Sequence, residues 1–245
     1  RVASLAQDAW KKARAASDFS IFQPMLERTV ELKKQEASIL GPDKHPYDVM
    51  LDTYEPGLTV NELTPIFDRL REGTREILSN ITPRQTAVSD VVLYRSYPKH
   101  SQLDFASAII KQLGFDLETG RVDLSAHPFC THFDATDVRL TTRIRENDLR
   151  SCLFGLVHES GHGMYEQGVS KELSRTPSGQ GASMGIHESQ SLFWENIIAR
   201  SEEFWHWAFP RLRSVFPDQL KDQDPATFFK AINKMQPSLN RVESD

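Results

Sequence analysis

The residues best suited to chemistry are His158, Glu159 and His162, which form the pattern H-E-x-x-H. On an α-helix, residues four positions apart lie on the same face, so both imidazoles could bind one metal ion. Glu159 directly follows the first histidine and could accept a proton from a metal-activated water. The pattern therefore predicts a zinc site that hydrolyses amide bonds, although so short a motif also occurs by chance.

A zinc ion in a hydrolytic site usually takes three protein ligands, so the chain must supply one more. The longer pattern H-E-x-x-H-x-x-G-x-x-H is excluded, because Tyr165 and Gly168 stand where it needs Gly and His. Glu188 is the next candidate, since it lies near the start of a second segment with helical apolar spacing. If that helix packs antiparallel to the first, Glu188 could reach the metal. The alternative is a helix N-terminal charge that binds no metal.

The elements that must position these residues are mostly helices. Asp148 is a good N-cap for the H-E-x-x-H helix. Gly161 and Gly163 each cost that helix roughly 1 kcal/mol, which suggests close packing around the site. Further helices are predicted at residues 1–17, 22–40, 61–78 (with Asn61 as N-cap), 101–113 and 225–235.

Residues 115–145 change to near-alternation of apolar and polar side chains, which is typical of short strands. We therefore expect a mainly α-helical protein with a small antiparallel β-sheet beside the H-E-x-x-H helix. In the segment 137–144, Arg139, Thr141 and Arg143 would share one polar face. We interpret this segment as a strand at the edge of a cleft, to which an extended peptide could add through main-chain hydrogen bonds. The alternative is a hairpin with a solvated polar face.

The composition fits a globular protein: the chain has 245 residues, of which 39% are hydrophobic and 26% charged. This length can bury a sizeable core in one or two domains. A formal net charge of −5 without a basic block argues against nucleic-acid binding. No apolar run approaches the roughly 18 residues of a membrane span. Cys130 and Cys152 fit free thiols in a reducing compartment, so we expect a cytoplasmic protein.

Four motifs follow one another in the chain: H-P-F at 127–129, D-x-R-x-T at 137–141, H-E-x-x-H at 158–162 and H-E-S-Q at 187–190. Together they resemble the carboxypeptidase Taq family, the thermostable carboxypeptidases. The family consists of gluzincins, zinc peptidases that remove residues from peptide C-termini, and the resemblance implies a helical zincin-like fold. A fifth family motif, Ile/Val-Arg-x-x-Ala-Asp, is matched at Arg241 and Asp245 but not at Asn240 and Ser244.

The resemblance implies that His158, His162 and Glu188 hold zinc, which cobalt or manganese could replace. Glu159 is then the general base that takes a proton from the metal-activated water and passes it to the leaving amine. The implied partner is a peptide substrate.

Three further residues are implied to contact that substrate. A carboxypeptidase must pair the terminal carboxylate of its substrate, which a guanidinium does in bidentate fashion. Arg139 and Arg241 are both candidates, and the sequence does not choose between them. His127 could donate a hydrogen bond to the substrate or to a developing oxyanion. The alternative for His127 is a turn residue held by Pro128.

The resemblance extends over nearly all of this chain, which corresponds to about the middle half of a family member. We expect residues 1–245 to form a single catalytic metallopeptidase domain, truncated at both ends and weakly active or inactive by itself. A homodimer is compatible with the sequence. Two alternatives remain: another gluzincin that acts as an endo- or aminopeptidase, and a catalytically inactive zinc-binding fragment.

Overall fold

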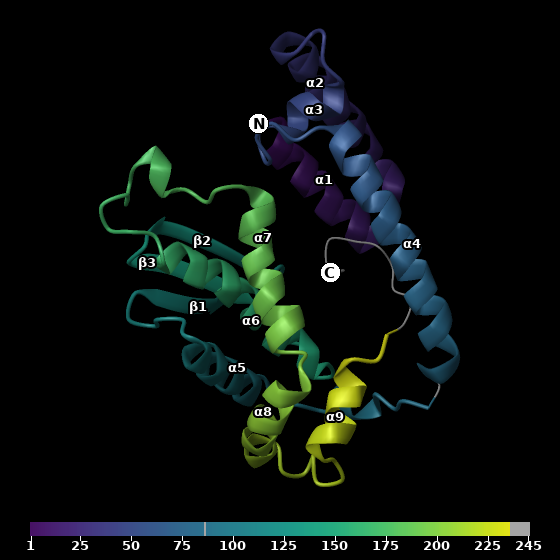
Figure 1. The fold of residues 1–245 in the computed structure, drawn as a ribbon, viewed down its shortest axis with the longest axis vertical. Coiled ribbons are helices and arrows are strands. Elements are labelled where there is room, and N and C mark those ends of the chain that lie inside the picture. The colour runs from purple at the N-terminus through teal and green to yellow at the C-terminus, as the bar shows by residue number, and fades with distance from the viewer. Residues whose placement is uncertain (86, 236–245) are drawn as a thin grey trace. The chain divides into compact units, whose positions relative to one another are not determined.

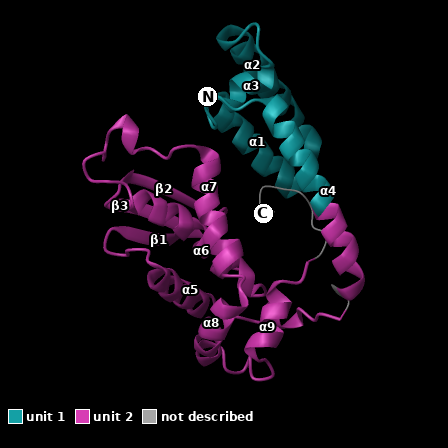
Figure 2. Ribbon diagram, in the orientation of Figure 1, with its two compact units in different colours: residues 1–73 teal, residues 74–245 magenta. Residues whose placement is uncertain are grey.

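The computed structural model describes residues 1–85 and 87–235. Its contacts divide the chain into two compact units, residues 1–73 and 74–245, which are coloured separately in Figure 2. The second unit contains the H-E-x-x-H segment. Such a division does not test whether both units belong to one catalytic domain, which stays a prediction. Among the described helices, none combines the length and apolar character needed to cross a membrane.

Helices make up the first unit and continue beyond it in α4. The helix α4 begins after Thr59, not after Asn61 as predicted. The Thr59 amide donates to the Glu62 carboxylate at 3.0 Å, and the Glu62 amide donates to the Thr59 hydroxyl. This reciprocal capping box satisfies two amides that a helix start leaves unpaired, which is why Thr59 is the cap. The elements are α1 (Val2–Ala16), α2 (Gln23–Leu40), α3 (Pro46–Leu51) and α4 (Val60–Gln85) (Figure 1).

The second unit combines helices with one small sheet, so the predicted mainly α-helical class is confirmed. A π-helix, η4, continues α7 directly. The elements are α5 (Lys99–Leu113), β1 (Gly120–Leu124), β2 (Phe129–Asp134), β3 (Asp137–Thr142), α6 (Leu149–Gln167), α7 (Met184–Leu192), η4 (Phe193–Ile198), α8 (Glu202–Val215) and α9 (Pro225–Ile232) (Figure 1).

Among the described residues, the strands form one sheet in the order β1-β3-β2. The strand β2 is antiparallel to β3, with Cys130 opposite Leu140, whereas β1 is parallel to β3, with Val122 opposite the same leucine. The sheet is therefore mixed, and the prediction of an antiparallel sheet was wrong in this respect. The chain reverses direction after β1 and again after β2. The two reversals make β3 run the same way as β1, and because β3 inserts between β1 and β2, it pairs with β1 in parallel.

The position of β3 also corrects the interpretation of residues 137–144 as a strand at the edge of a cleft. Both sides of β3 are paired with other strands, so its main chain is not available to an added peptide. Val138 and Leu140 are fully buried. The structure places α6 against the sheet, α5 and α7, so α6 is the element around which this unit packs (Figure 1).

Two glycines let α6 approach its neighbours closely, as the sequence suggested. A Cβ at Gly161 would lie 2.6 Å from the Cα of Ser191 in α7. A Cβ at Gly163 would lie 2.7 Å from the ring of Phe115 and 3.0 Å from Leu140. These distances are shorter than van der Waals contact, so both positions exclude a side chain. The close approach to α7 brings two helices with candidate metal ligands together.

Replacing Gly161 by Ala should lower the free energy of unfolding by about 1–3 kcal/mol, because the new methyl group meets backbone atoms that cannot move aside. The matched control is Gly155→Ala in the same helix. There a Cβ would be 3.5 Å from Pro128 and Thr142, an ordinary contact. This variant should be neutral or more stable by about 0.5–1 kcal/mol, because alanine favours a helix interior. Urea titrations of the metal-free variants measure both effects, and equal effects would contradict the packing argument.

Candidate metal centre

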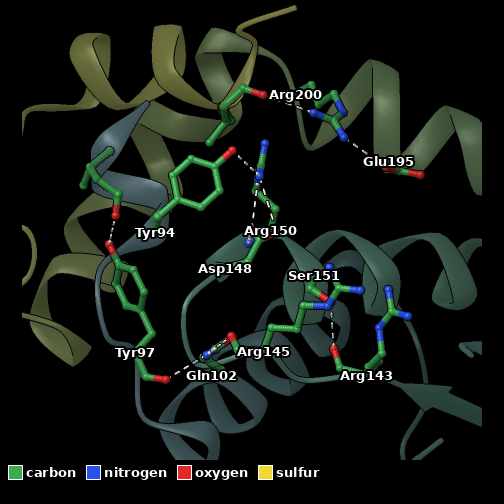
Figure 3. Close-up of polar contacts among 12 residues, drawn as sticks. Tyr94, Tyr97, Gln102, Arg143, Arg145, Asp148, Arg150, Ser151, Glu195 and Arg200 are labelled. Atoms are coloured by element: carbon green, nitrogen blue, oxygen red, sulfur yellow. Dashed lines mark hydrogen bonds and ion pairs between the residues drawn. The ribbon is translucent and has the colours of Figure 1, made fainter. Parts of the chain in front are cut away.

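Helix α6 presents the two histidines of the H-E-x-x-H pattern on one face. Asp148 caps the helix as predicted, accepting a hydrogen bond from the Arg150 amide at 3.1 Å, and its carboxylate also pairs with the Arg150 guanidinium (Figure 3). The rings of His158 and His162 lie 5.1 Å apart between centroids. Both side chains are mostly buried. The helix therefore holds two imidazoles at a spacing that one ion can bridge.

Helix α7 brings the predicted third ligand to these histidines. The hydroxyl of Ser183 caps the helix by accepting from the Ile186 amide at 3.2 Å. Glu188 then places Oε1 3.7 Å from Nε2 of His158 and Oε2 3.3 Å from Nε2 of His162. The candidate ligand atoms of the three residues all lie within 4.8 Å of one another. Two helices from different parts of the chain thus converge on one point.

The donor set and its spacing fit a divalent transition metal such as zinc. Two imidazole nitrogens and a carboxylate oxygen are ligands that zinc accepts, at bonds of about 2.0–2.2 Å. Two such ligands at tetrahedral angles lie about 3.4 Å apart. The 3.3 and 3.7 Å separations of Glu188 from the two histidines match that value.

His158 has a second carboxylate partner on its other ring nitrogen. Its Nδ1 lies 3.0 Å from Oε2 of Glu195, a buried residue of η4. The guanidinium of Arg200 holds Glu195 in turn, at 3.1 Å (Figure 3). Burial would raise the pKa of Glu195, but the hydrogen bond from His158 and the charge of Arg200 outweigh it and lower that pKa. A carboxylate on Nδ1 orients the imidazole and leaves Nε2 directed at Glu188.

The two histidines differ in charge when no metal is bound. Burial lowers the pKa of His158, but the hydrogen bond to Glu195 and the nearby negative charges outweigh it and raise the pKa to about 9. Burial, and then the positive charge of His158, lower the pKa of His162 to about 4. At neutral pH a metal ion therefore competes with a proton at His158 but meets a neutral imidazole at His162.

Glu159, the predicted general base, lies on α6 and is 6% exposed. Burial, and then the negative charges of Glu159 and Glu166, raise the pKa of the Cys130 thiol to about 12. The cysteine is therefore an unreactive packed thiol, and Glu159 belongs to a buried acidic region where α6 faces β2.

The predicted substrate residues lie in different places. Arg139 pairs with Asp137 through two hydrogen bonds of 2.8 and 2.9 Å, and its guanidinium lies over the ring of Phe133. Its neighbours in β3, Val138 and Leu140, are buried, and side chains alternate along a strand. Arg139 thus lies on the sheet face turned away from α6 and is not brought to the metal ligands.

The other two substrate candidates lie outside regular elements. His127 is exposed in the loop between β1 and β2. The next residue, Pro128, lies beside Gly155, which is less than one turn before His158 on α6. His127 therefore directly precedes a residue that lies beside α6, the helix of His158 and His162. Arg241 falls outside the described residues.

Four residues around the ligands had no role in the sequence-based prediction. Glu195 backs His158, and His187 contacts His162 with its Nδ1 2.6 Å from the Nδ1 of that ligand. His187 in turn contacts Glu166, and Glu166 contacts His132. A spacing of four from His162 to Glu166, and of seven from Glu188 to Glu195, placed both acids on the ligand-bearing helix faces. The spacing alone did not reveal their partners.

The model of the carboxypeptidase Taq (M32) metallopeptidase family matches residues 1–245. The chain belongs to this family. Membership of the M32 family implies a metal cofactor, and the cluster of His158, His162 and Glu188 is the candidate site for it.

Relatives in the M32 family share sequence and fold across the whole chain. Carboxypeptidase 1 of Bacillus subtilis is 41% identical and covers 99% of the chain, and thermostable carboxypeptidase 1 of Thermus thermophilus is 42% identical over the same share. An M32 carboxypeptidase structure from Deinococcus radiodurans superposes with a TM-score of 0.91 at 36% identity, covering 100% of the chain. The chain spans about half the length of these relatives, 48–49%.

Proposed function

We propose that this chain contributes the metal centre of a zinc-dependent carboxypeptidase that hydrolyses the C-terminal peptide bond of peptides. The observation that carries the proposal is the convergence of Glu188 on His158 and His162, with 3.3 and 3.7 Å between candidate ligand atoms. Membership of the M32 family supports the reaction class. The three side chains would hold zinc, which cobalt or manganese could replace.

Each residue of the site has a separate role in the proposed reaction. Zinc, when bound, would lower the pKa of water and polarise the scissile carbonyl. Glu159 accepts the proton of the attacking water and delivers it to the leaving amine. Burial of Glu159 strengthens its interactions with the reacting charges, because the local dielectric constant is low. Glu195 keeps His158 oriented throughout.

The substrate carboxylate needs a cation to pair with it. Arg139 offers its guanidinium to Asp137 and lies on the sheet face turned away from α6, so we assign this role to Arg241 instead. His127 remains the proposed donor to the substrate carbonyl, because Pro128 contacts α6 at Gly155, shortly before His158. A cytoplasmic location and a homodimer stay predictions.

The direction of cleavage tests the carboxypeptidase assignment. A peptide with a free C-terminus should lose single residues from that end, and the same peptide with an amidated C-terminus should be cut at least about tenfold more slowly. Amidation removes the charge that a guanidinium pairs, and a charged hydrogen bond is worth about 1.5–3 kcal/mol. Mass spectrometry of the products from the zinc-loaded chain measures both rates.

Three other results would favour other functions. Equal cleavage of the two peptides would contradict carboxylate recognition. Internal or N-terminal products would indicate a gluzincin endo- or aminopeptidase. Retained zinc without turnover of either peptide would favour a zinc-binding fragment, in keeping with a chain that spans about half the length of its relatives.

A further inference from the structure

A buried carboxylate outside the ligand set connects three elements of the fold. Glu166 lies on α6, is 3% exposed, and has two histidines beside its carboxylate. Nε2 of His187 in α7 lies 2.6 Å from Oε1 of Glu166, and Nδ1 of His132 in β2 lies 3.3 Å from the same oxygen. His132 pairs with Val138 in the sheet, so both face α6. A buried carboxylate is costly unless it is hydrogen-bonded, and the contact with His187 supplies a hydrogen bond.

His187 connects Glu166 to the candidate metal ligand His162. An ionised carboxylate can only accept hydrogen bonds, so Nε2 of His187 carries a proton. The Nδ1 atoms of His187 and His162 are 2.6 Å apart, which requires one hydrogen between them. In a neutral His187 the proton on Nε2 leaves Nδ1 as an acceptor, so Nδ1 of His162 is the donor. A neutral His162 then has its lone pair on Nε2, 3.3 Å from the Glu188 carboxylate.

The opposite arrangement would disable the metal site. If the hydrogen between the two rings belonged to Nδ1 of His187, His187 would donate to His162, and the proton of a neutral His162 would sit on Nε2. That nitrogen would then have no lone pair for a metal ion. The direction of the hydrogen bonds along Glu166, His187 and His162 thus decides whether His162 can act as a ligand.

We propose that Glu166 and His187 are positioning residues, which hold His162 as the tautomer whose Nε2 binds the metal, while His132 anchors the Glu166 carboxylate. This inference rests on the proposed metal centre. The two ligands are supported differently: Glu195 contacts His158 directly, whereas Glu166 acts on His162 through a second imidazole. Groups of this kind typically contribute about 10- to 100-fold to metal affinity.

Zinc affinity, measured by competition with a chelating dye, tests the proposal on the whole chain. Glu166→Gln and His187→Ala should each weaken zinc binding about 10- to 100-fold. The double variant should be no weaker than His187→Ala, because Glu166 has no route to His162 once the intervening ring is gone. As a control, Glu172→Gln removes the same charge from an exposed position and should leave affinity unchanged. Unchanged affinity in Glu166→Gln, or additive losses in the double variant, would overturn the proposal.

A spectroscopic measurement keeps the proposal falsifiable if a variant fails to fold. In the unmodified, metal-free chain, ¹⁵N chemical shifts of the imidazoles should show His162 protonated on Nδ1 and His187 on Nε2. A general packing role for Glu166 predicts no particular tautomer. If His162 proves to be protonated on Nε2, then Glu166 and His187 do not hold the proposed tautomer. This readout needs no bound zinc, so it separates failure of this positioning role from failure of the proposed metal centre, which would appear as absent zinc binding in the unmodified chain.

Discussion

Zinc affinity should fall by more than about 100-fold when Glu188 is replaced by Gln. Changes to groups behind a ligand already cost about 10- to 100-fold, and Glu188 is assigned to the metal itself. Glutamine keeps the shape of the side chain but removes the negative charge that faces the cation. It also leaves His158 and His162 without the carboxylate that lies 3.7 and 3.3 Å away. Metal analysis after dialysis, with affinities from chelator competition, measures the loss.

The competing explanation treats Glu188 as a charge that favours the helix dipole, although the first turn of α7 holds no acidic residue and Glu188 lies beyond it. Such a charge is worth at most about 1 kcal/mol at the surface. Glu203→Gln is the matched control, because Glu203 is an exposed acid in the first turn of α8. It should retain full zinc. If Glu188→Gln also retains full zinc, the assignment of the third ligand is wrong.

Turnover should drop about 10²- to 10⁴-fold in Glu159→Gln while zinc remains bound. This range is typical of the removal of a general base, because the amide cannot accept the proton of the attacking water. Zinc affinity should change little, since the three assigned ligands are intact. The two variants therefore fail differently: Glu188→Gln loses metal first, and Glu159→Gln loses catalysis alone.

The prediction for Glu159→Gln is tested by measuring the rate of peptide hydrolysis at saturating zinc. The metal content is determined on the same sample. Glu159 is 6% exposed, so the variant must also be shown to unfold at the same urea concentration as the unmodified chain. The control for turnover is Glu203→Gln, which should be as active as the unmodified chain. Loss of zinc from Glu159→Gln, or full turnover with zinc bound, would remove Glu159 from the role of base.

The sequence by itself determined the features of the H-E-x-x-H helix that depend on residues close together in the chain. The spacing of His158 and His162 required one helix face, and Asp148 supplied the side-chain oxygen that starts that helix. Gly161 and Gly163 indicated close packing, which the short distances to α7 and Phe115 confirm. These features depend on residues within one or two turns of each other, so the period of the helix and the chemistry of its cap suffice to predict them.

The tertiary structure decided everything that depends on how separate elements meet. The insertion of β3 between β1 and β2 made the sheet mixed. The packing of α6 on the face of Val138 and Leu140 left Arg139 on the other face. The approach of α7 and η4 to α6 gave His162 a contact with His187 and gave His158 a contact with Glu195.

The residues of each of these contacts are far apart in the chain, so the spacing of residues within one helix or strand cannot predict that they meet. His132 meets Glu166 because a strand packs against a helix, and Glu195 reaches His158 because two helices cross where Gly161 admits the closer backbone. Pairings of this kind are set by side-chain volume and burial across the whole unit. The sequence could therefore name the candidate metal ligands, whereas the groups that contact them followed from the packing.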